Sequence, residues 1–110
     1  MADVETNVRA VLTTVPNAEV GASIAHALVE ERLAACVNVL PGVRSFYRWE
    51  DDVQDDAELL LVIKTRAGCC EALAARINAL HPYDLPEVLV LPAVGGSAAY
   101  LSWIEAETTS

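Results

Sequence analysis

The fold of this chain depends most on one stretch, Cys36-Val-Asn-Val-Leu-Pro-Gly-Val-Arg-Ser-Phe-Tyr-Arg-Trp-Glu50. It is rich in β-branched and aromatic residues, which favour a strand. Before Pro41-Gly42 both faces are mainly apolar, as in a central strand. Proline lacks a backbone donor and glycine tolerates a bulge, so we expect the strand to kink there. Beyond the kink, Ser45, Tyr47 and Trp49 share one face.

The next strand is predicted over residues 57–66, where apolar and polar side chains alternate. Together with the first stretch it makes one long hairpin. Six acidic residues fall between the two apolar runs, and they lack the glycine and the spacing of a calcium loop. We therefore expect a solvated acidic turn at the hairpin tip, comprising Glu50, Asp51, Asp52, Asp55, Asp56 and Glu58.

The flanking elements complete the pattern of an α+β domain. We predict a strand over 7–15, a helix from an Asn17 cap to near Leu33, a helix over 68–80, a strand over 87–93 and a helix over 97–106 capped by Ser97. The order β-α-β-β-α-β followed by a short helix predicts a ferredoxin-like fold. In that fold a four-stranded antiparallel sheet carries its helices on one face.

The length of 110 residues indicates a single domain over 1–110, with residues 1–6 as a disordered tail. Hydrophobic residues make up 54 % of the chain, yet no run approaches the about 20 apolar residues of a membrane span. The sheet face without helices needs cover, so the apolar surplus predicts an interface between subunits.

Charge and cysteine usage restrict the partners and the compartment. The net charge is −9, which argues against nucleic acid and suits attraction of cations. Residues 1–7 carry no apolar signal-peptide core, and no membrane partner is expected. Three cysteines at 36, 69 and 70 suggest reduced thiols, and we expect a cytoplasmic protein.

The connector His81-Pro-Tyr-Asp-Leu-Pro86, followed by Glu87, is the strongest candidate site. One imidazole with one or two nearby carboxylates suits copper or zinc, but a single subunit supplies too few ligands for a closed site. The open alternative is that His81 caps the carbonyl groups at the end of the preceding helix.

Several other side chains invite weaker interpretations. Tyr47, Trp49, Tyr100 and Trp103 are residue types that favour interfaces. Lys64 stands on an otherwise apolar strand face and is expected to pair with Glu87 or Glu58. A third hypothesis is an enzyme that uses Lys64 or His81 as an acid or base. The sequence shows no nucleophile–base pair, so we expect no enzyme.

These motifs, taken together, resemble the CutA (divalent-cation-tolerance) family. The resemblance spans about residues 8 to 104, and it rests on Val11–Pro16, Glu31–Asn38, Pro41–Glu50, Ile63–Thr65, His81–Tyr83, Pro86–Glu87 and Tyr100–Trp103.

The resemblance implies a homotrimer with PII-like architecture and a role in tolerance of copper and other divalent cations. It identifies His81 with the family's metal-associated histidine, while Thr13 and Leu80 stand where some bacterial members carry a cysteine and a second histidine. It also implies clefts between subunits, lined by Tyr47, Trp49, Lys64, Tyr83, Glu87, Tyr100 and Trp103.

The sequence therefore predicts a homotrimer that responds to divalent metal ions. His81 would be the principal ligand of Cu(II) or another divalent cation, assisted by Glu87 or Asp84. A small ligand in the clefts is a further expectation, and no organic cofactor is expected. The alternative is a PII-like signalling module that binds a partner protein and holds metal incidentally.

Overall fold

The computed structural model describes residues 6–109. The expected order of elements is confirmed, with a third helix at the end of the chain. The elements are β1 (Val8–Val15), α1 (Ala18–Glu30), β2 (Cys36–Trp49), β3 (Asp52–Arg66), α2 (Cys70–Leu80), β4 (Leu89–Pro92) and α3 (Ala98–Glu107), with a 3-10 turn at Ala67–Cys69 before α2.

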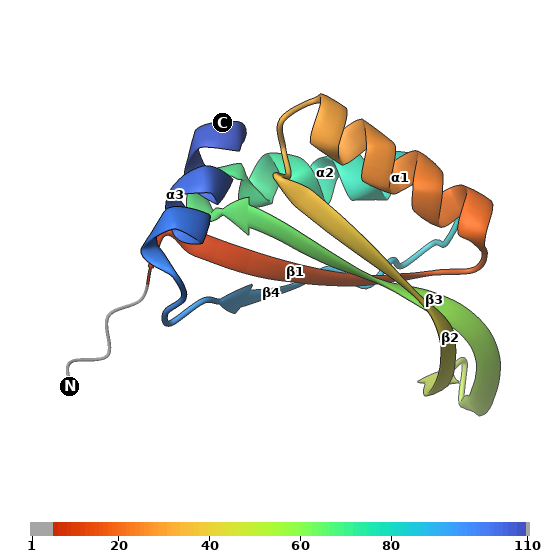
Figure 1. Cartoon of the computed structure of the whole chain (residues 1–110). Coiled ribbons are helices and arrows are strands. Elements are labelled where there is room, and N and C mark those ends of the chain that lie inside the picture. Colours follow the sequence, from red (N-terminus) through yellow and green to blue (C-terminus); the bar gives the residue numbers. More distant parts are fainter. Residues whose placement is uncertain (1–5, 110) are drawn as a thin grey trace.

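All four strands form one antiparallel sheet in the order β2-β3-β1-β4. Strand β1 pairs with β3 from Val8 opposite Arg66 to Val15 opposite Leu59. Helices α1 and α2 lie on one face of this sheet, and α3 lies at its end (Figure 1). The predicted α+β architecture, with both long helices on one face, is confirmed.

The helices begin where the sequence predicts. The side chain of Asn17 accepts a hydrogen bond from the Val20 amide at 2.9 Å, and that of Ser97 accepts one from the Tyr100 amide at 3.2 Å. Such caps satisfy amide groups that the first helical turn leaves unpaired. Helix α1 ends at Glu30, earlier than expected, and Arg32 with φ 61° turns the chain toward β2.

The core lies between the sheet and the two helices. Alternate residues of β1 and β3 face the helices, where strand periodicity places every second side chain on the same side. The fully buried residues of this core are Val11, Val15, Ile24, Leu28, Leu61, Ile63, Leu73 and Ile77.

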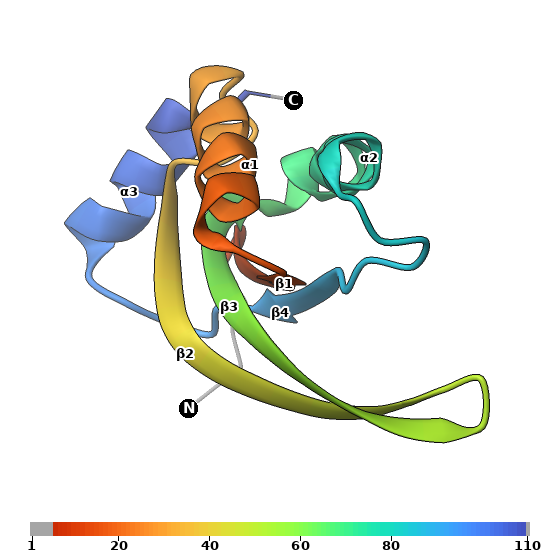
Figure 2. The same ribbon diagram turned by 90° about the vertical axis from the view of Figure 1, so that its right-hand side faces the viewer.

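The β2–β3 hairpin extends well beyond the rest of the sheet. A register shift between Leu40 and Val43 confirms the predicted kink, and Gly42 adopts φ 79° there. We call residues 43–58, beyond this shift, the arm. Figure 2 shows the arm curving away from the helices.

The expected acidic turn is wrong in its extent. Only Glu50 and Asp51 form the turn, and both have the positive φ of a two-residue type I′ hairpin loop. Asp52, Asp55, Asp56 and Glu58 lie in β3, paired with β2. The pairing with aromatic and β-branched residues across the hairpin carries these acidic residues into the strand.

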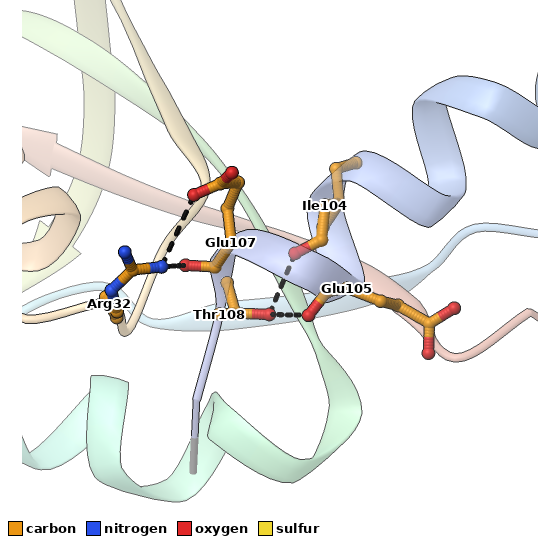
Figure 3. A network of polar contacts seen from close by, with 5 residues as sticks. All are labelled: Arg32, Ile104, Glu105, Glu107 and Thr108. Carbon is orange, nitrogen blue, oxygen red and sulfur yellow. Dashed lines mark hydrogen bonds and ion pairs between the residues drawn. The ribbon is translucent and has the colours of Figure 1, made fainter.

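Helix α3 is tied to the loop after α1 (Figure 3). Arg32 Nη1 donates to the carbonyl oxygen of Glu107 at 3.5 Å and lies 3.3 Å from its carboxylate. The hydroxyl of Thr108 donates to the Ile104 carbonyl at 2.9 Å, and the Thr109 amide donates to the Arg32 carbonyl at 2.9 Å. These bonds hold the C-terminal end of α3 against the loop between α1 and β2.

Three remaining expectations need adjustment. Strand β4 is shorter than the predicted 87–93, because Glu87 and Val88 belong to the connector and the strand ends at Pro92. The predicted disordered tail lies outside the described residues except for Thr6, whose amide donates to the Ala93 carbonyl at 3.1 Å. Among residues 6–109, no helix has the length and apolar character to cross a membrane.

Candidate functional site

An open pocket of about 890 Å³ lies between the arm and the connector that joins α2 to β4. The arm contributes mainly the face that carries Ser45, Tyr47 and Trp49, the connector contributes the opposite wall, and β1 contributes one residue. The lining residues are Thr14, Ser45, Phe46, Tyr47, Trp49, Asp56, Glu58, Pro82, Tyr83, Asp84, Leu85, Pro86 and Glu87.

His81 is buried, with 8 % of its surface exposed, and both of its ring nitrogens are engaged. The Tyr83 amide donates to Nδ1 at 3.1 Å, so Nδ1 carries the lone pair. Nε2 therefore carries the proton in the neutral ring and donates to the Thr14 carbonyl at 2.7 Å. The side chain thus fixes the connector to β1. The backbone amide of His81 donates to the Ile77 carbonyl at 2.9 Å, so the expected cap at the end of α2 is confirmed, but the main chain makes it.

Two tyrosines join the walls of the pocket through carboxylates. The Tyr83 hydroxyl donates to Glu58 Oε2 at 2.8 Å, linking the connector to the arm. Within the arm, the Tyr47 hydroxyl donates to Asp56. Burial, and then the hydrogen bond to Glu58, raises the pKa of Tyr83 well above its usual range. The bond to Asp56 is the main reason that the pKa of Tyr47 is also raised.

The pocket is strongly acidic. Four carboxylates line it, and no lysine, arginine or histidine stands among its described lining residues. Glu58 is buried, with 6 % exposed, whereas Asp84 and Glu87 are exposed. Negative charge gathered in a cleft attracts cations. Within residues 6–109, however, no three His, Cys, Asp or Glu side chains are grouped closely enough to hold a metal ion.

The structure gathers some predicted site residues and separates others. Tyr47, Trp49, Tyr83, Asp84 and Glu87 all line the pocket, and His81 lies directly beneath the connector, its ring centroid 4.6 Å from that of Tyr83.

Three predicted site residues do not line this pocket, namely Lys64, Tyr100 and Trp103. Lys64 donates to Asn38 and lies 4.0 Å from the sulfur of Cys36, so the expected pairing with Glu87 or Glu58 is wrong. Tyr100 and Trp103 stack on each other along α3, with ring centroids 5.8 Å apart.

The sequence did not identify the two carboxylates that the arm contributes to the pocket. The sequence predicts Asp56 and Glu58 in a solvated turn, whereas in the structure Asp56 pairs with Ser45 and thereby shares a face with Tyr47. Alternation along a longer β3 was the signal that could have found them. Thr14, Phe46 and Leu85 of the lining carried no separate signal.

Comparison with known proteins gives consistent matches over almost the whole chain. The family model described as CutA1 divalent ion tolerance protein matches residues 9–107. The chain is 52 % identical over 98 residues to the divalent-cation tolerance protein CutA of Thermus thermophilus, covering 89 % of this chain and 95 % of that protein. The solved structure of the Thermus thermophilus protein superimposes with a TM-score of 0.91, covering 93 % of this chain and 99 % of that one.

Two further relatives bear on length and compartment. The chloroplastic CutA protein of Arabidopsis thaliana is 52 % identical over 89 % of this chain, which spans 54 % of that relative's length. A structure from Archaeoglobus fulgidus, titled a periplasmic divalent cation tolerance protein, is 31 % identical with a TM-score of 0.88, covering 91 % of this chain and 97 % of that one. Relatives of this chain are therefore named for more than one compartment.

Proposed function

This chain belongs to the CutA1 divalent ion tolerance family, and on that premise we propose that it binds a divalent cation, Cu(II) in particular, at the connector edge of its acidic pocket. His81 would be the principal ligand, with Glu87 or Asp84 assisting. The observation that carries this proposal is the placement of the His81 connector against a pocket with four carboxylates and no basic lining residue.

The hydrogen bonds of His81 specify how a metal would bind. Nε2–H donates a hydrogen bond to the Thr14 carbonyl, so in the neutral ring Nδ1 is the nitrogen with an available lone pair. A cation therefore has to take Nδ1 and displace the Tyr83 amide. This exchange would move the connector and with it the phenol that contacts Glu58, which gives metal binding a structural consequence.

The incomplete ligand set favours an oligomer or water as the source of the remaining ligands. We propose a homotrimer, because the sheet face opposite the helices is apolar and uncovered in one chain. Leu40, Leu89 and Leu91 lie on that face, and each exposes at least 41 % of its surface. A monomer by light scattering at micromolar concentration would contradict this part of the proposal.

Metal binding is tested by titrating the protein with Cu(II) against a competing chelator. His81→Ala is expected to lose the saturable site, whereas His26→Ala should keep it, because His26 lies exposed on α1 beside Glu30. These two variants form a matched pair, since His26 and His81 are the two histidines of the sequence.

A second variant keeps the test decisive if His81→Ala fails to fold. Glu87→Gln changes an exposed pocket residue and should weaken Cu(II) binding without unfolding the chain. Equal binding by the wild type, His81→Ala and Glu87→Gln would contradict a site at the connector.

We also propose that the protein works in the cytoplasm. Its three cysteines are all free, and one of them, Cys69, is fully buried, a pattern that suits a reducing compartment. Cell fractionation with detection of the native chain tests this, and recovery in a periplasmic or organellar fraction would contradict it.

A further inference from the structure

The pocket has a second property that metal binding does not use: its walls are aromatic. Four of the chain's six aromatic side chains line it, namely Phe46, Tyr47, Trp49 and Tyr83. We propose that the pocket binds an organic ammonium ion, a protonated amine carried on an apolar body. This proposal does not rest on Cu(II) binding or on His81 as a ligand.

The buried carboxylate of Glu58 favours a positively charged ligand. Glu58 exposes only 6 % of its surface, and its one hydrogen bond comes from the neutral phenol of Tyr83. No ion pair joins Glu58 to a basic side chain within residues 6–109. A carboxylate held out of water gains from a cation placed beside it.

Asp56 provides a second carboxylate on the same wall. It stands two residues before Glu58 on β3, so the two side chains project from one face about 7 Å apart at their backbone positions. Each accepts one tyrosine hydroxyl, and each carboxylate has further lone pairs for an ammonium group.

The aromatic rings favour an organic cation over a bare metal ion on this wall. Ring faces attract alkylammonium groups and also contact apolar carbon, whereas they offer no ligand atom to a metal. The tyrosine hydroxyls are occupied by Asp56 and Glu58, which fixes both rings. The volume of about 890 Å³ lies within the range of small-molecule sites, about 300–1,000 Å³.

The test compares three probes of similar shape and different charge. We would titrate the wild-type protein, in the presence of a chelator, with 2-phenylethylamine, 2-phenylethanol and 3-phenylpropanoate, following tryptophan fluorescence and calorimetry. The amine is expected to bind at least about tenfold more tightly than the alcohol, because a desolvated cation on a ring and a carboxylate gains that much. The acid should not bind.

Variants locate the site. Trp49→Leu and Asp56→Asn should each weaken amine binding by about fivefold or more, since one removes a ring and the other a charge. Glu71→Gln is the matched control, because Glu71 is an exposed acid on α2 away from the pocket. Thermal unfolding of each variant shows that its fold is retained.

Two results would overturn the proposal. One is equal affinity for the amine and the alcohol, and the other is amine binding that Trp49→Leu and Asp56→Asn leave unchanged. Because a chelator is present throughout, amine binding and its loss are scored independently of the Cu(II) titration. Failure of the copper site would thus leave this result readable, and the reverse also holds.

Discussion

The two halves of the β2–β3 hairpin are made by the same two strands but are held in opposite ways. In the inner half, Leu61 and Ile63 are fully buried against the helices, and β1 pairs with β3 along its whole length. In the arm, Phe46 and Val53 expose 63 % and 66 % of their surfaces, and β3 has only β2 as a neighbour.

An isolated two-stranded hairpin is marginally stable in water, so the arm needs support from outside itself. Within the chain that support comes from the connector, through the Tyr83–Glu58 hydrogen bond. The inner half therefore supplies the stability of the hairpin, whereas the arm shapes the pocket and depends on the connector for support. The following predictions test that division.

The largest effect is expected in the inner half. Leu61→Ala removes a fully buried side chain and should lower the free energy of unfolding by about 2–5 kcal/mol. Val53→Ala in the arm should change it by about 0.5 kcal/mol or less, as exposed substitutions do. Urea denaturation at one protein concentration measures both. Similar losses for the two variants would show that the arm is as firmly packed as the core.

The next effect concerns the link between connector and arm. Tyr83→Phe leaves the buried Glu58 carboxylate without its donor, which should cost about 1–3 kcal/mol of unfolding free energy. Tyr47→Phe should cost less, because its partner Asp56 is only half-buried and can regain hydration. A larger loss in Tyr47→Phe, measured by the same denaturation, would argue that the arm holds itself.

A smaller effect is expected at the boundary between the halves. Gly42 has φ 79°, and a Cβ added there would meet no atom within 4 Å, so Gly42→Ala causes no clash but strains the backbone by about 1–2 kcal/mol. Gly95→Ala is the control, because it also meets open space and its φ is not positive. If thermal unfolding finds both variants equal to the wild type, the kink is not held by Gly42.

The inner half could be predicted from the sequence and the arm only in part. Alternation places Leu59, Leu61 and Ile63 on one face whatever surrounds them, and the caps at Asn17 and Ser97 are local chemistry. The arm needed knowledge of pairing, because acidic residues such as Asp56 disfavour strands on their own and are placed there by β2.

The site followed the same division. The connector was found because prolines stiffen it around a lone histidine. The ring contacts of His81 with Thr14 and Tyr83 could not be predicted, since they depend on how β1 passes beneath the connector. Glu58 was missed for the same reason: its partner Tyr83 is 25 residues away in the chain.

The Tyr83–Glu58 hydrogen bond should also make the stability of the fold depend on pH. Burial and the bond to Glu58 raise the pKa of Tyr83 in the folded chain, whereas an unfolded tyrosine loses its proton near pH about 10. The folded state then binds more protons above that pH, so this contribution to stability is full below pH about 10 and is lost as the pH rises toward the folded pKa. Urea midpoints at rising alkaline pH should therefore fall more steeply in the wild type than in Tyr83→Phe. Parallel slopes would mean that the phenol is free to ionise and that the arm is not tied to the connector.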